Sequence, residues 1–542
     1  MITSSGSKRY GVVLALILVI GLVPRMYHVD YPPIGYHSMK EVHYLSVAKG
    51  YLDFGDYLHK RVLYSGMSGR EGYIESLPQF QLLPLMLFGL WKVFGIRIWI
   101  ARLVVISFSM GCIAITCPVG RRLGLDEETS LLASFMMAVM PLSVFFGRNI
   151  QPDAAALFFL LLSTYYYLKW IDETRPGDML LLSLSIFATA ITKITFLFPV
   201  IALLFLFPFG RLTDGGFRKA LLRQSLWPLL GLLMIAAWLI FTRATSVYSK
   251  DLIPRGRILL AESFTYGYWR TKLPTVWKYI GMNFTFIYAG IFALGIFWSF
   301  LNIRSRAGRY VLGSVVSAIL YFLLISDFAV RHSYYHMPFL PAVCIGTAAA
   351  LGGALSLLEF GSRKVFKYIA LLAVVTISLP SLASGVTRHY DIMMLGCDVA
   401  GRYIKEHGSP SDRIFISYGS PSDRRYDAFR TQLYGILWEA GKRGALLPAD
   451  LEDVTFGAGE RRMNWIMLYN RKWLDQDREI LDFIHGNYSI SQIGFKDGDV
   501  LYYLMRLGGK FDTEPFGDIE KRLAREYGFS YGNVELHVKE IR

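Results

Sequence analysis

Long apolar runs, joined by short connections that carry the charges, constrain this sequence more than any other feature. Each run comes close to the ~20 residues that an α-helix needs to cross the hydrocarbon core of a bilayer. Because a helix satisfies its backbone polar groups internally, such runs predict a polytopic α-helical membrane protein. About eleven transmembrane helices are expected on this length criterion. The runs lie at Tyr10–Met26, Trp99–Val119, Thr129–Phe146, Ala154–Trp170, Met179–Thr192, Thr195–Phe209, Leu226–Thr242, Trp277–Phe300, Tyr310–Ile325, Met337–Leu358 and Phe366–Leu382.

The composition supports a membrane protein and argues against a nucleic-acid-binding one. Of the 542 residues, 53% are hydrophobic, and the mean hydropathy is +0.37. A formal net charge of +15 would suggest nucleic acid in a soluble protein. Here no basic domain interleaved with aromatic residues is present, and basic cytoplasmic loops in contact with anionic membrane lipids explain the charge. We therefore expect membrane lipids, and no nucleic acid, as partners.

Basic residues on alternate connections predict the orientation of the chain. If the N-terminus is cytoplasmic, the inner connections each hold several Lys or Arg residues, whereas the short outer turns hold Arg148, Lys193 and Arg331 only. The run Phe80–Phe94 is short and contains Pro84 and Gly89, so we expect a surface or re-entrant segment. We expect the plasma (cell) membrane of a prokaryote, because the long outer tail has no paired cysteines and no retention signal.

The expected domains follow from this orientation. Residues 1–387 are predicted to form a transmembrane domain, with a first outer loop at 27–97 that holds surface helices and another outer loop at 243–274. Residues 388–542 are charged and alternate strand-like with helical stretches, which predicts a small extracytoplasmic α/β domain. The strand-like stretches are Arg413–Tyr418, Asn464–Tyr469 and Val500–Met505, and the helical ones are Tyr426–Arg443 and Asp477–His485.

Ionisable side chains gather where the expected helices meet the outer face. At such depth they are costly unless they are paired or line a wet cavity, so each is a candidate for function. For any one of them, snorkelling or a salt bridge between helix ends explains the residue equally well, but the set on one face favours a site. The set is Arg25, Asp30, His37, Glu41, Glu75, Arg148, Asp153, Lys193, Arg243, Arg331, His332 and His336.

The stretch Tyr31–Tyr51 in the first outer loop is too polar to span a membrane but has a helical apolar pattern. His37 and Glu41 are four residues apart near its N-terminal end. We expect a short surface helix that holds a carboxylate over a cavity between the transmembrane helices.

Three further outer segments carry candidate cations. In the turn FFGRNIQPD, Arg148 closes one run and Asp153 opens the next. This turn predicts either a guanidinium and a carboxylate at the cavity mouth opposite Glu41, or an Asp153 that serves only as a helix cap. Arg331, His332 and His336 suit phosphate better than a metal, since two histidines lack a third nearby ligand. In the loop 249–274, Arg255 and Arg257 lie among aromatic residues, which predicts either a lid over an anionic lipid headgroup or a plain interfacial segment.

These motifs, taken in order, resemble the GT-C membrane glycosyltransferases of the protein O-mannosyltransferase and lipid A aminoarabinose transferase type. The resemblance covers about the first 390 residues. No Trp-Trp-Asp string is present, so the oligosaccharyltransferase branch is not supported. The matching motifs are Pro24-Arg25, Ala48-Lys49, GYIESLPQF before LFGLWKVFG, Ala101–Leu103, Gly120–Gly124, FFGRNIQPD and HSYYHMPFLP.

The resemblance implies transfer of a sugar from a polyprenyl-phosphate carrier to an acceptor on the outer face, with inversion if displacement is direct. Glu41 matches the glutamate of the family's Asp-Glu pair, but Lys40 stands where the catalytic Asp is expected, so Glu41, Asp30 and His37 are the candidate bases. Asp153 matches the second acidic position. A divalent cation is optional in enzymes of this type.

The segment that begins at Glu75 replaces a Lys-Pro-Pro motif of the family, which removes a lysine expected at the carrier phosphate. Lys193, Arg255 or Arg331 are the candidate replacements. Two other functions stay open, namely a lipid or sugar transporter and a non-catalytic scaffold in which Lys40 marks the lost base.

Overall fold

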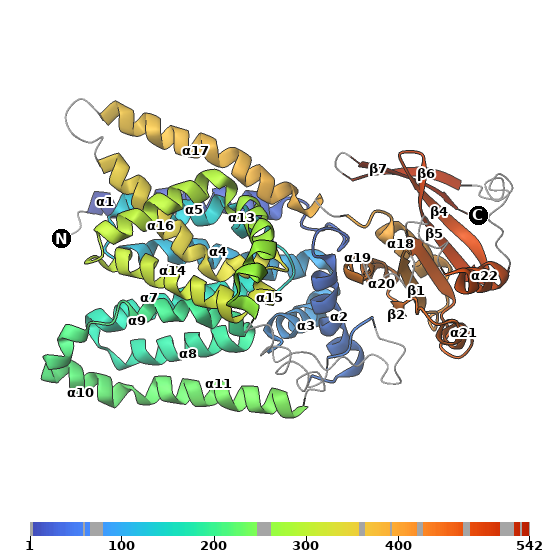
Figure 1. Cartoon of the computed structure of the whole chain (residues 1–542), viewed down its shortest axis with the longest axis horizontal. Helices are drawn as coiled ribbons and strands as arrows, with labels where there is room; N and C mark the ends of the chain where they lie inside the picture. The colour runs from blue at the N-terminus through green and yellow to red at the C-terminus, as the bar shows by residue number, and fades with distance from the viewer. Residues whose placement is uncertain are drawn as a thin grey trace. The chain divides into compact units, whose positions relative to one another are not determined.

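The computed structural model describes residues 4–57, 60–64, 80–245, 262–356, 364–390, 393–419, 427–469, 477–509, 525–531 and 534–540 (Figure 1). The chain divides into two compact units. Unit 1 comprises Met1–Val29, Glu75–Met86 and Trp99–Thr387, and unit 2 comprises Asp30–Ile74, Leu87–Ile98 and Arg388–Arg542.

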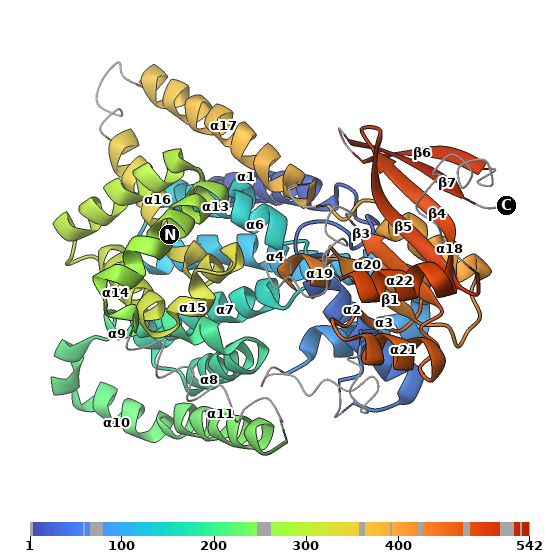
Figure 2. The same ribbon diagram turned by 45° about the vertical axis from the view of Figure 1, so that its right-hand side comes forward.

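Unit 1 is helical. Its helices of ten residues or more are α1 (Ser4–Met26), α4 (Ile98–Arg122), α5 (Glu127–Val139), α7 (Asp153–Glu173), α8 (Pro176–Thr192), α10 (Gly215–Gln224), α11 (Leu226–Thr245), α13 (Tyr266–Leu301), α14 (Arg306–Leu324), α16 (Leu340–Ser356) and α17 (Lys364–Thr387). Short helices α6 (Pro141–Phe146), α9 (Ile201–Leu204) and α15 (Ser326–Ala329), and the 3-10 segments η1 (Ile194–Val200), η2 (Phe209–Thr213) and η3 (Ser333–Phe339), lie between them. Helices α7, α8 and α11 lie side by side in both ribbon views (Figures 1 and 2).

Within the described residues, seven helices are long and apolar enough to cross a membrane. Shorter apolar helices occur at Tyr10–Met26, Leu82–Phe94, Pro176–Thr192 and Ile194–Leu204. The polytopic helical class is thus confirmed, whereas a count of eleven is not. Proline explains part of the difference: the run Thr129–Phe146 breaks after α5, because Pro141 lacks the N–H that would continue that helix.

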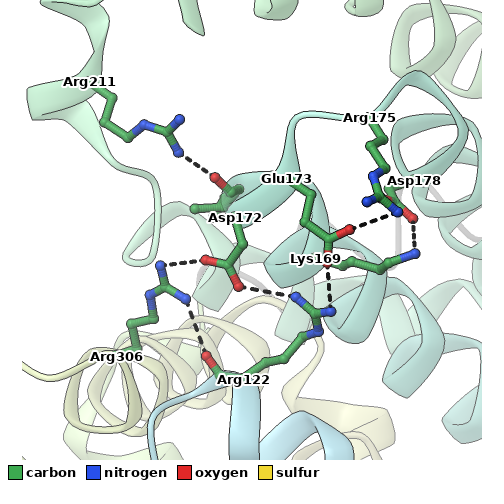
Figure 3. Close-up of polar contacts among 9 residues, drawn as sticks. Arg122, Lys169, Asp172, Glu173, Arg175, Asp178, Arg211 and Arg306 are labelled. Atoms are coloured by element: carbon green, nitrogen blue, oxygen red, sulfur yellow. Dashed lines mark hydrogen bonds and ion pairs between the residues drawn. The ribbon is translucent and has the colours of Figure 1, made fainter. Parts of the chain in front are cut away.

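A network of ion pairs joins the ends of α4, α7, α8 and α14 (Figure 3). The Arg122 guanidinium pairs with Asp172 at 3.1 Å and with Glu173 at 2.9 Å, and Arg306 reaches the other oxygen of Asp172 at 2.7 Å. Beside it, Lys169 pairs with Asp178 at 2.7 Å. These residues lie at helix ends that are expected to be cytoplasmic. Carboxylates therefore neutralise part of the basic charge from which the orientation is predicted.

Unit 2 contains a seven-stranded sheet with the order β2-β1-β3-β5-β4-β7-β6 (Figure 2). Strands β2, β1 and β3 pair in parallel, and the remaining pairs are antiparallel. The strands are β1 (Ile414–Tyr418), β2 (Gly444–Leu446), β3 (Trp465–Tyr469), β4 (Tyr488–Lys496), β5 (Asp499–Leu507), β6 (Arg525–Tyr531) and β7 (Val534–Glu540). The predicted C-terminal α/β architecture is therefore present.

Period-two alternation gives the sheet two buried faces. Ile414 and Ile416 face a core shared with α18 (Cys397–His407) and α20 (Gly435–Ala440). Phe415, between them, faces a second core shared with α21 (Leu451–Gly459) and α22 (Arg478–Asn487). The sheet is thus the middle layer of three.

Residues of the first outer loop belong to the first of these cores. Tyr31, Ile34 and Leu63 are buried together with the residues of α18 and α20. The loop helix α2 (Ser38–Phe54) packs against α20 and against α19 (Asp427–Gln432), while Tyr64 forms a parallel bridge with Gly444 of β2. Unit 2 is therefore assembled from both ends of the chain, together with the last part of α3 (Leu82–Phe94).

Candidate functional site

A buried ion pair joins the start of α7 to the end of α8. The Lys193 ammonium donates to Asp153 Oδ1 at 2.7 Å, and the two side chains are 8% and 1% exposed. Asp153 is the first residue of α7, where the helix dipole favours a negative charge. Lys193 has an extended backbone (φ −160°) that ends α8, so its side chain lies where the chain changes from α8 to η1.

The ammonium of Lys193 also lies over aromatic rings of η3. It is 4.3 Å from the ring centre of Tyr334 and 5.2 Å from that of Tyr335. A cation held by a carboxylate and by ring faces is well fixed, because both interactions are stronger when little water is present. The predicted candidates Asp153 and Lys193 are therefore brought together by the fold.

Several buried polar atoms on the elements that carry or border this pair have no hydrogen-bond partner within the described part of the chain. They lie on the turn after α6, on α7, on α8 and on η3, which pack against one another or against η1. Buried polar groups of this kind are rare in native proteins, and a ligand or water usually satisfies them. The atoms are Asn149 Oδ1, Gln151 Nε2, Asp153 Oδ2, Thr192 Oγ1 and His336 Nε2. The sequence pointed to Asp153 and His336, but it gave no signal for Asn149, Gln151 or Thr192.

The hydrogen bonds of Asn283 determine which nitrogen of His336 carries the proton. Asn283 Nδ2 lies 2.8 Å from the Ser333 carbonyl oxygen and 3.1 Å from His336 Nδ1. A carbonyl oxygen only accepts, so the atom beside it is the amide nitrogen, which donates to both partners. His336 Nδ1 must then accept, and the proton is on Nε2. The imidazole therefore offers a buried N–H donor on η3, the segment whose Tyr334 and Tyr335 rings lie by Lys193.

The other predicted site residues of this part of the chain differ in burial and in their contacts. Arg148 is buried, and its Nη2 donates to the His28 carbonyl oxygen at 2.7 Å. Arg331 is exposed, and the His332 ring stacks on Tyr334 with 5.2 Å between centroids. Arg243 lies near the end of α11. Arg255, Arg257 and Glu75 lie outside the described residues.

Arg25 is fully buried and uses all of its donors within unit 1. Its guanidinium donates to the hydroxyls of Ser109 and Ser143, both at 2.8 Å, and to the carbonyl oxygens of Gly21, Met137 and Ala138. The last two oxygens belong to the end of α5, where no further helical N–H donates to them. This arrangement stabilises the break between α5 and α6, and it leaves no N–H of Arg25 for a ligand.

Replacing Arg25 by Met should lower the stability of unit 1 by about 2–4 kcal/mol, because several buried acceptors would lose their donor at about 1–3 kcal/mol each. Thermal unfolding of the purified protein in detergent would measure the change. The control is Arg218→Met on α10, whose side chain is exposed and which should unfold as the wild type does. Equal stability of Arg25→Met and wild type would show that water replaces the guanidinium without cost.

The first-loop candidates lie in unit 2. Helix α2 starts at Ser38 after His37, whose φ of 63° prevents the helix from extending further back. His37 and Glu41 are 4% and 5% exposed, whereas Asp30 is exposed. Glu41 lies in the first turn of α2. The position of Arg148 and Asp153 at a cavity mouth opposite Glu41 remains a prediction.

Contacts from the C-terminal part of unit 2 fix the position of α2. Ser38 Oγ donates to the Gln432 carbonyl oxygen at 2.9 Å, and the Tyr64 ring stacks on Tyr434 with 4.4 Å between centroids. Tyr64 OH and His43 Nδ1, on α2, form a hydrogen bond. Burial, with help from Lys40 and Lys60, lowers the pKa of His43 to about 3, so this imidazole stays neutral at physiological pH. No local pattern in the sequence could reveal these contacts.

The described residues contain no group of three His, Cys, Asp or Glu side chains placed to hold a metal ion. The optional divalent cation of the resemblance remains a prediction.

Comparisons with known proteins confirm the resemblance. A family model described as dolichyl-phosphate-mannose-protein mannosyltransferase matches residues 15–247, which include Glu41, Asp153 and Lys193. A search of curated protein sequences found no match.

Two solved structures resemble this chain over almost its whole length. One is the oligosaccharyltransferase AglB from Archaeoglobus fulgidus in complex with an inhibitory peptide and a dolichol-phosphate; at 11% identity and a TM-score of 0.58, the match covers 92% of this chain and 74% of AglB. The other is ArnT from Cupriavidus metallidurans bound to undecaprenyl phosphate; at 14% identity and a TM-score of 0.55, it covers 92% of this chain and 98% of ArnT. At these identities the likeness shows the fold. The chain is a multi-span membrane protein with the GT-C fold.

Proposed function

We propose that this GT-C-fold chain is a membrane glycosyltransferase that moves a sugar from a polyprenyl-phosphate carrier to an acceptor on the extracytoplasmic face of the cell membrane. The mannosyltransferase family model supports the proposal, as does the likeness to two proteins whose structures contain dolichol-phosphate or undecaprenyl phosphate. The observation that carries it is the buried Asp153–Lys193 pair, whose second carboxylate oxygen has no hydrogen-bond partner within the described residues.

The proposed reaction breaks the bond between the anomeric carbon and the carrier phosphate oxygen. The electron pair stays on the phosphate, so cations and N–H donors must stabilise its negative charge. Lys193 supplies a fixed ammonium, and His336 supplies the Nε2–H donor. Asp153 holds Lys193 through Oδ1, and its free Oδ2 accepts a hydrogen bond from a hydroxyl of the donor sugar.

The acceptor oxygen attacks the anomeric carbon from the opposite face, so the configuration inverts. Its proton passes to a carboxylate acting as general base. We assign this role to Glu41, which is buried on α2, rather than to the exposed Asp30 or to His37. Arg148, Arg331 and His332 are assigned to the carrier phosphate or its surroundings, with Arg255 and Arg257 as further candidates.

The competing function is a non-catalytic scaffold, which Lys40 favours because it stands where the family has a catalytic Asp. The test uses purified protein in lipid nanodiscs with a panel of polyprenyl-phosphate-linked sugars, with cell extract as the source of acceptors. Release of polyprenyl phosphate from one carrier supports the enzyme, and transfer of hexose or pentose labels identifies the sugar class. No release from any carrier would leave the scaffold or a transporter as the function.

The packing of α2 gives a further prediction. At Gly435, a Cβ atom would lie 2.6 Å from the Pro33 carbonyl oxygen, which is too close for any side chain. Gly435→Ala should displace the segment that leads into α2 and lower release about 10–100-fold, since small misplacements of a catalytic group are costly. The measurement is the release rate at saturating donor.

The matched control is Gly486→Ala on α22, where a Cβ would meet nothing within 4 Å. It should keep the wild-type rate. Full activity of Gly435→Ala would mean that the C-terminal part of unit 2 does not position α2 for catalysis.

A further inference from the structure

Unit 2 contains a cavity of about 440 Å³ between α2 and three loops of the C-terminal sheet. Ser46, Lys49, Gly50 and Asp53 line one wall, a spacing that places them on one face of α2. At about 100° of rotation per residue, Glu41 lies roughly 130° around the helix from the middle of this face, and it is not among the lining residues. The cavity is therefore distinct from the proposed catalytic position.

The lining of this cavity is strongly basic. Seven of the lining residues are Lys or Arg and three are Asp or Glu. Two of the three acids are already paired. Asp53 pairs with Lys49 at 2.6 Å, and Asp412 accepts hydrogen bonds from Asn464 at 2.6 Å and Trp465 at 2.9 Å. Burial raises the pKa of Asp412, but these hydrogen bonds together outweigh it and lower the pKa, so the carboxylate is committed to its own loop. Arg61 also pairs with Asp56, which is not a lining residue, at 3.7 Å. The cavity still keeps an excess of positive charge.

Two of the basic side chains pack on an aromatic ring. The guanidinium groups of Arg61 and Arg443 lie 4.3 Å and 5.1 Å from the ring centre of Phe54. Arg462 has a φ of 55°, a left-handed conformation that costs a non-glycine residue free energy. Its carbonyl oxygen accepts from the backbone N–H of Arg413 at 2.9 Å, which helps to hold the turn. Ordered cations and a strained turn are typical of a preformed binding site.

We propose that this cavity binds an acidic glycan, meaning a saccharide segment that carries carboxylate or phosphate groups. Its volume exceeds that of a single phosphate ion, so a ligand of several polar rings fits it better. Among the described residues, the hydrophobic lining consists of Phe54, Val62, Leu63 and Pro410, which is too little to enclose an acyl chain. The inference rests on the proposed function, since the ligand would be a remote part of the acceptor, anchored on a face of α2 that does not include Glu41.

The test is direct binding to the full-length protein in neutral phosphatidylcholine nanodiscs, measured by fluorescence anisotropy. The probes are labelled tetragalacturonate, a phosphorylated mannose oligosaccharide and neutral mannotetraose. We expect saturable binding of an acidic probe, weakened by salt, and no binding of mannotetraose. The double variant Arg443→Gln/Arg462→Gln should bind about tenfold more weakly or worse, since charge-assisted hydrogen bonds are lost.

Two further variants separate charge from folding. Arg443→Lys/Arg462→Lys keeps the charge and should retain most of the binding, and Arg478→Gln, exposed on α22 outside the cavity, should bind like the wild type. Equal affinity of the Gln double variant and wild type would overturn the proposal. The proposal would also be overturned if soluble dihexanoyl-phosphatidylglycerol bound in a way that depends on Arg443 and Arg462 while no glycan probe bound.

Polyprenyl phosphate release, assayed on the same preparation, separates this inference from the proposed function. Release without glycan binding would refute the inference alone. Glycan binding without release would support the site and count against the enzyme.

Discussion

Glu41→Gln is expected to lower the rate of polyprenyl phosphate release by about 10²–10⁴-fold, the usual contribution of a general base. The amide has the shape of the carboxylate but cannot take the acceptor's proton. The loss should fall on kcat, with the KM for the donor nearly unchanged, because the proton transfer occurs in the transition state. Steady-state kinetics with the carrier that the wild type accepts would measure both constants.

The matched control is Glu479→Gln. Like Glu41, Glu479 lies in the first turn of a unit 2 helix, but it is exposed on α22. It should leave both constants unchanged. If Glu41→Gln retains wild-type kcat, the base is elsewhere, and the same assay on Asp30→Asn and His37→Gln would identify it.

Asp153→Asn is expected to lower release by about 10³-fold, because the substitution removes the carboxylate that holds Lys193 and the Oδ2 assigned to the sugar. Lys193 would then lie buried beside a neutral amide, which disfavours the charged ammonium. Both kcat and the apparent donor affinity should fall. Binding of the donor lipid can be followed separately by competition with free polyprenyl phosphate.

Unit 1 provides a close control for this prediction. Asp178 and Lys169 form a second pair at the same distance of 2.7 Å, and the Asp178 side chain is 4% exposed. Asp178→Asn should disturb stability comparably but leave release near the wild-type rate. If Asp178→Asn loses as much activity as Asp153→Asn, the effect of Asp153 is structural. Asp153→Asn/Lys193→Met, which removes both charges, should fold well and remain inactive.

The sequence could predict which ionisable residues are buried at a cost in free energy. Asp153 and Lys193 are isolated ionisable groups at the ends of apolar runs, and the structure pairs them. Arg25 satisfied the same criterion, yet its guanidinium donates to backbone carbonyls and hydroxyls of its own unit. Burial of a charge therefore identifies a constrained residue. Whether its partner is protein or ligand depends on tertiary contacts, such as the end of α5, that no local pattern encodes.

The fold was predictable where the apolar residues of a segment have the spacing typical of one kind of secondary structure. Strand β1 coincides with the predicted strand-like stretch Arg413–Tyr418, and it has Ile414 and Ile416 on one face and Phe415 on the other. The number of membrane helices was less predictable, because a proline inside an apolar run changes the geometry without changing hydropathy. The run Thr195–Phe209 illustrates this: it begins as the 3-10 segment η1, which contains Pro199. The joining of the first outer loop to the C-terminal sheet was not predictable at all.

That joining has a consequence for how the protein is made. Ser38 and Gln432, which share a hydrogen bond, are separated by 394 residues. At a synthesis rate of about 5–20 residues per second, roughly 20–80 seconds pass between the appearance of the two. During that time Tyr31, Ile34 and Leu63 have no core to enter. The helix that carries Glu41 can therefore reach its final position in unit 2 only after the C-terminal part of unit 2 has been made. A chain that stops early would leave the proposed general base unplaced even with every membrane helix formed.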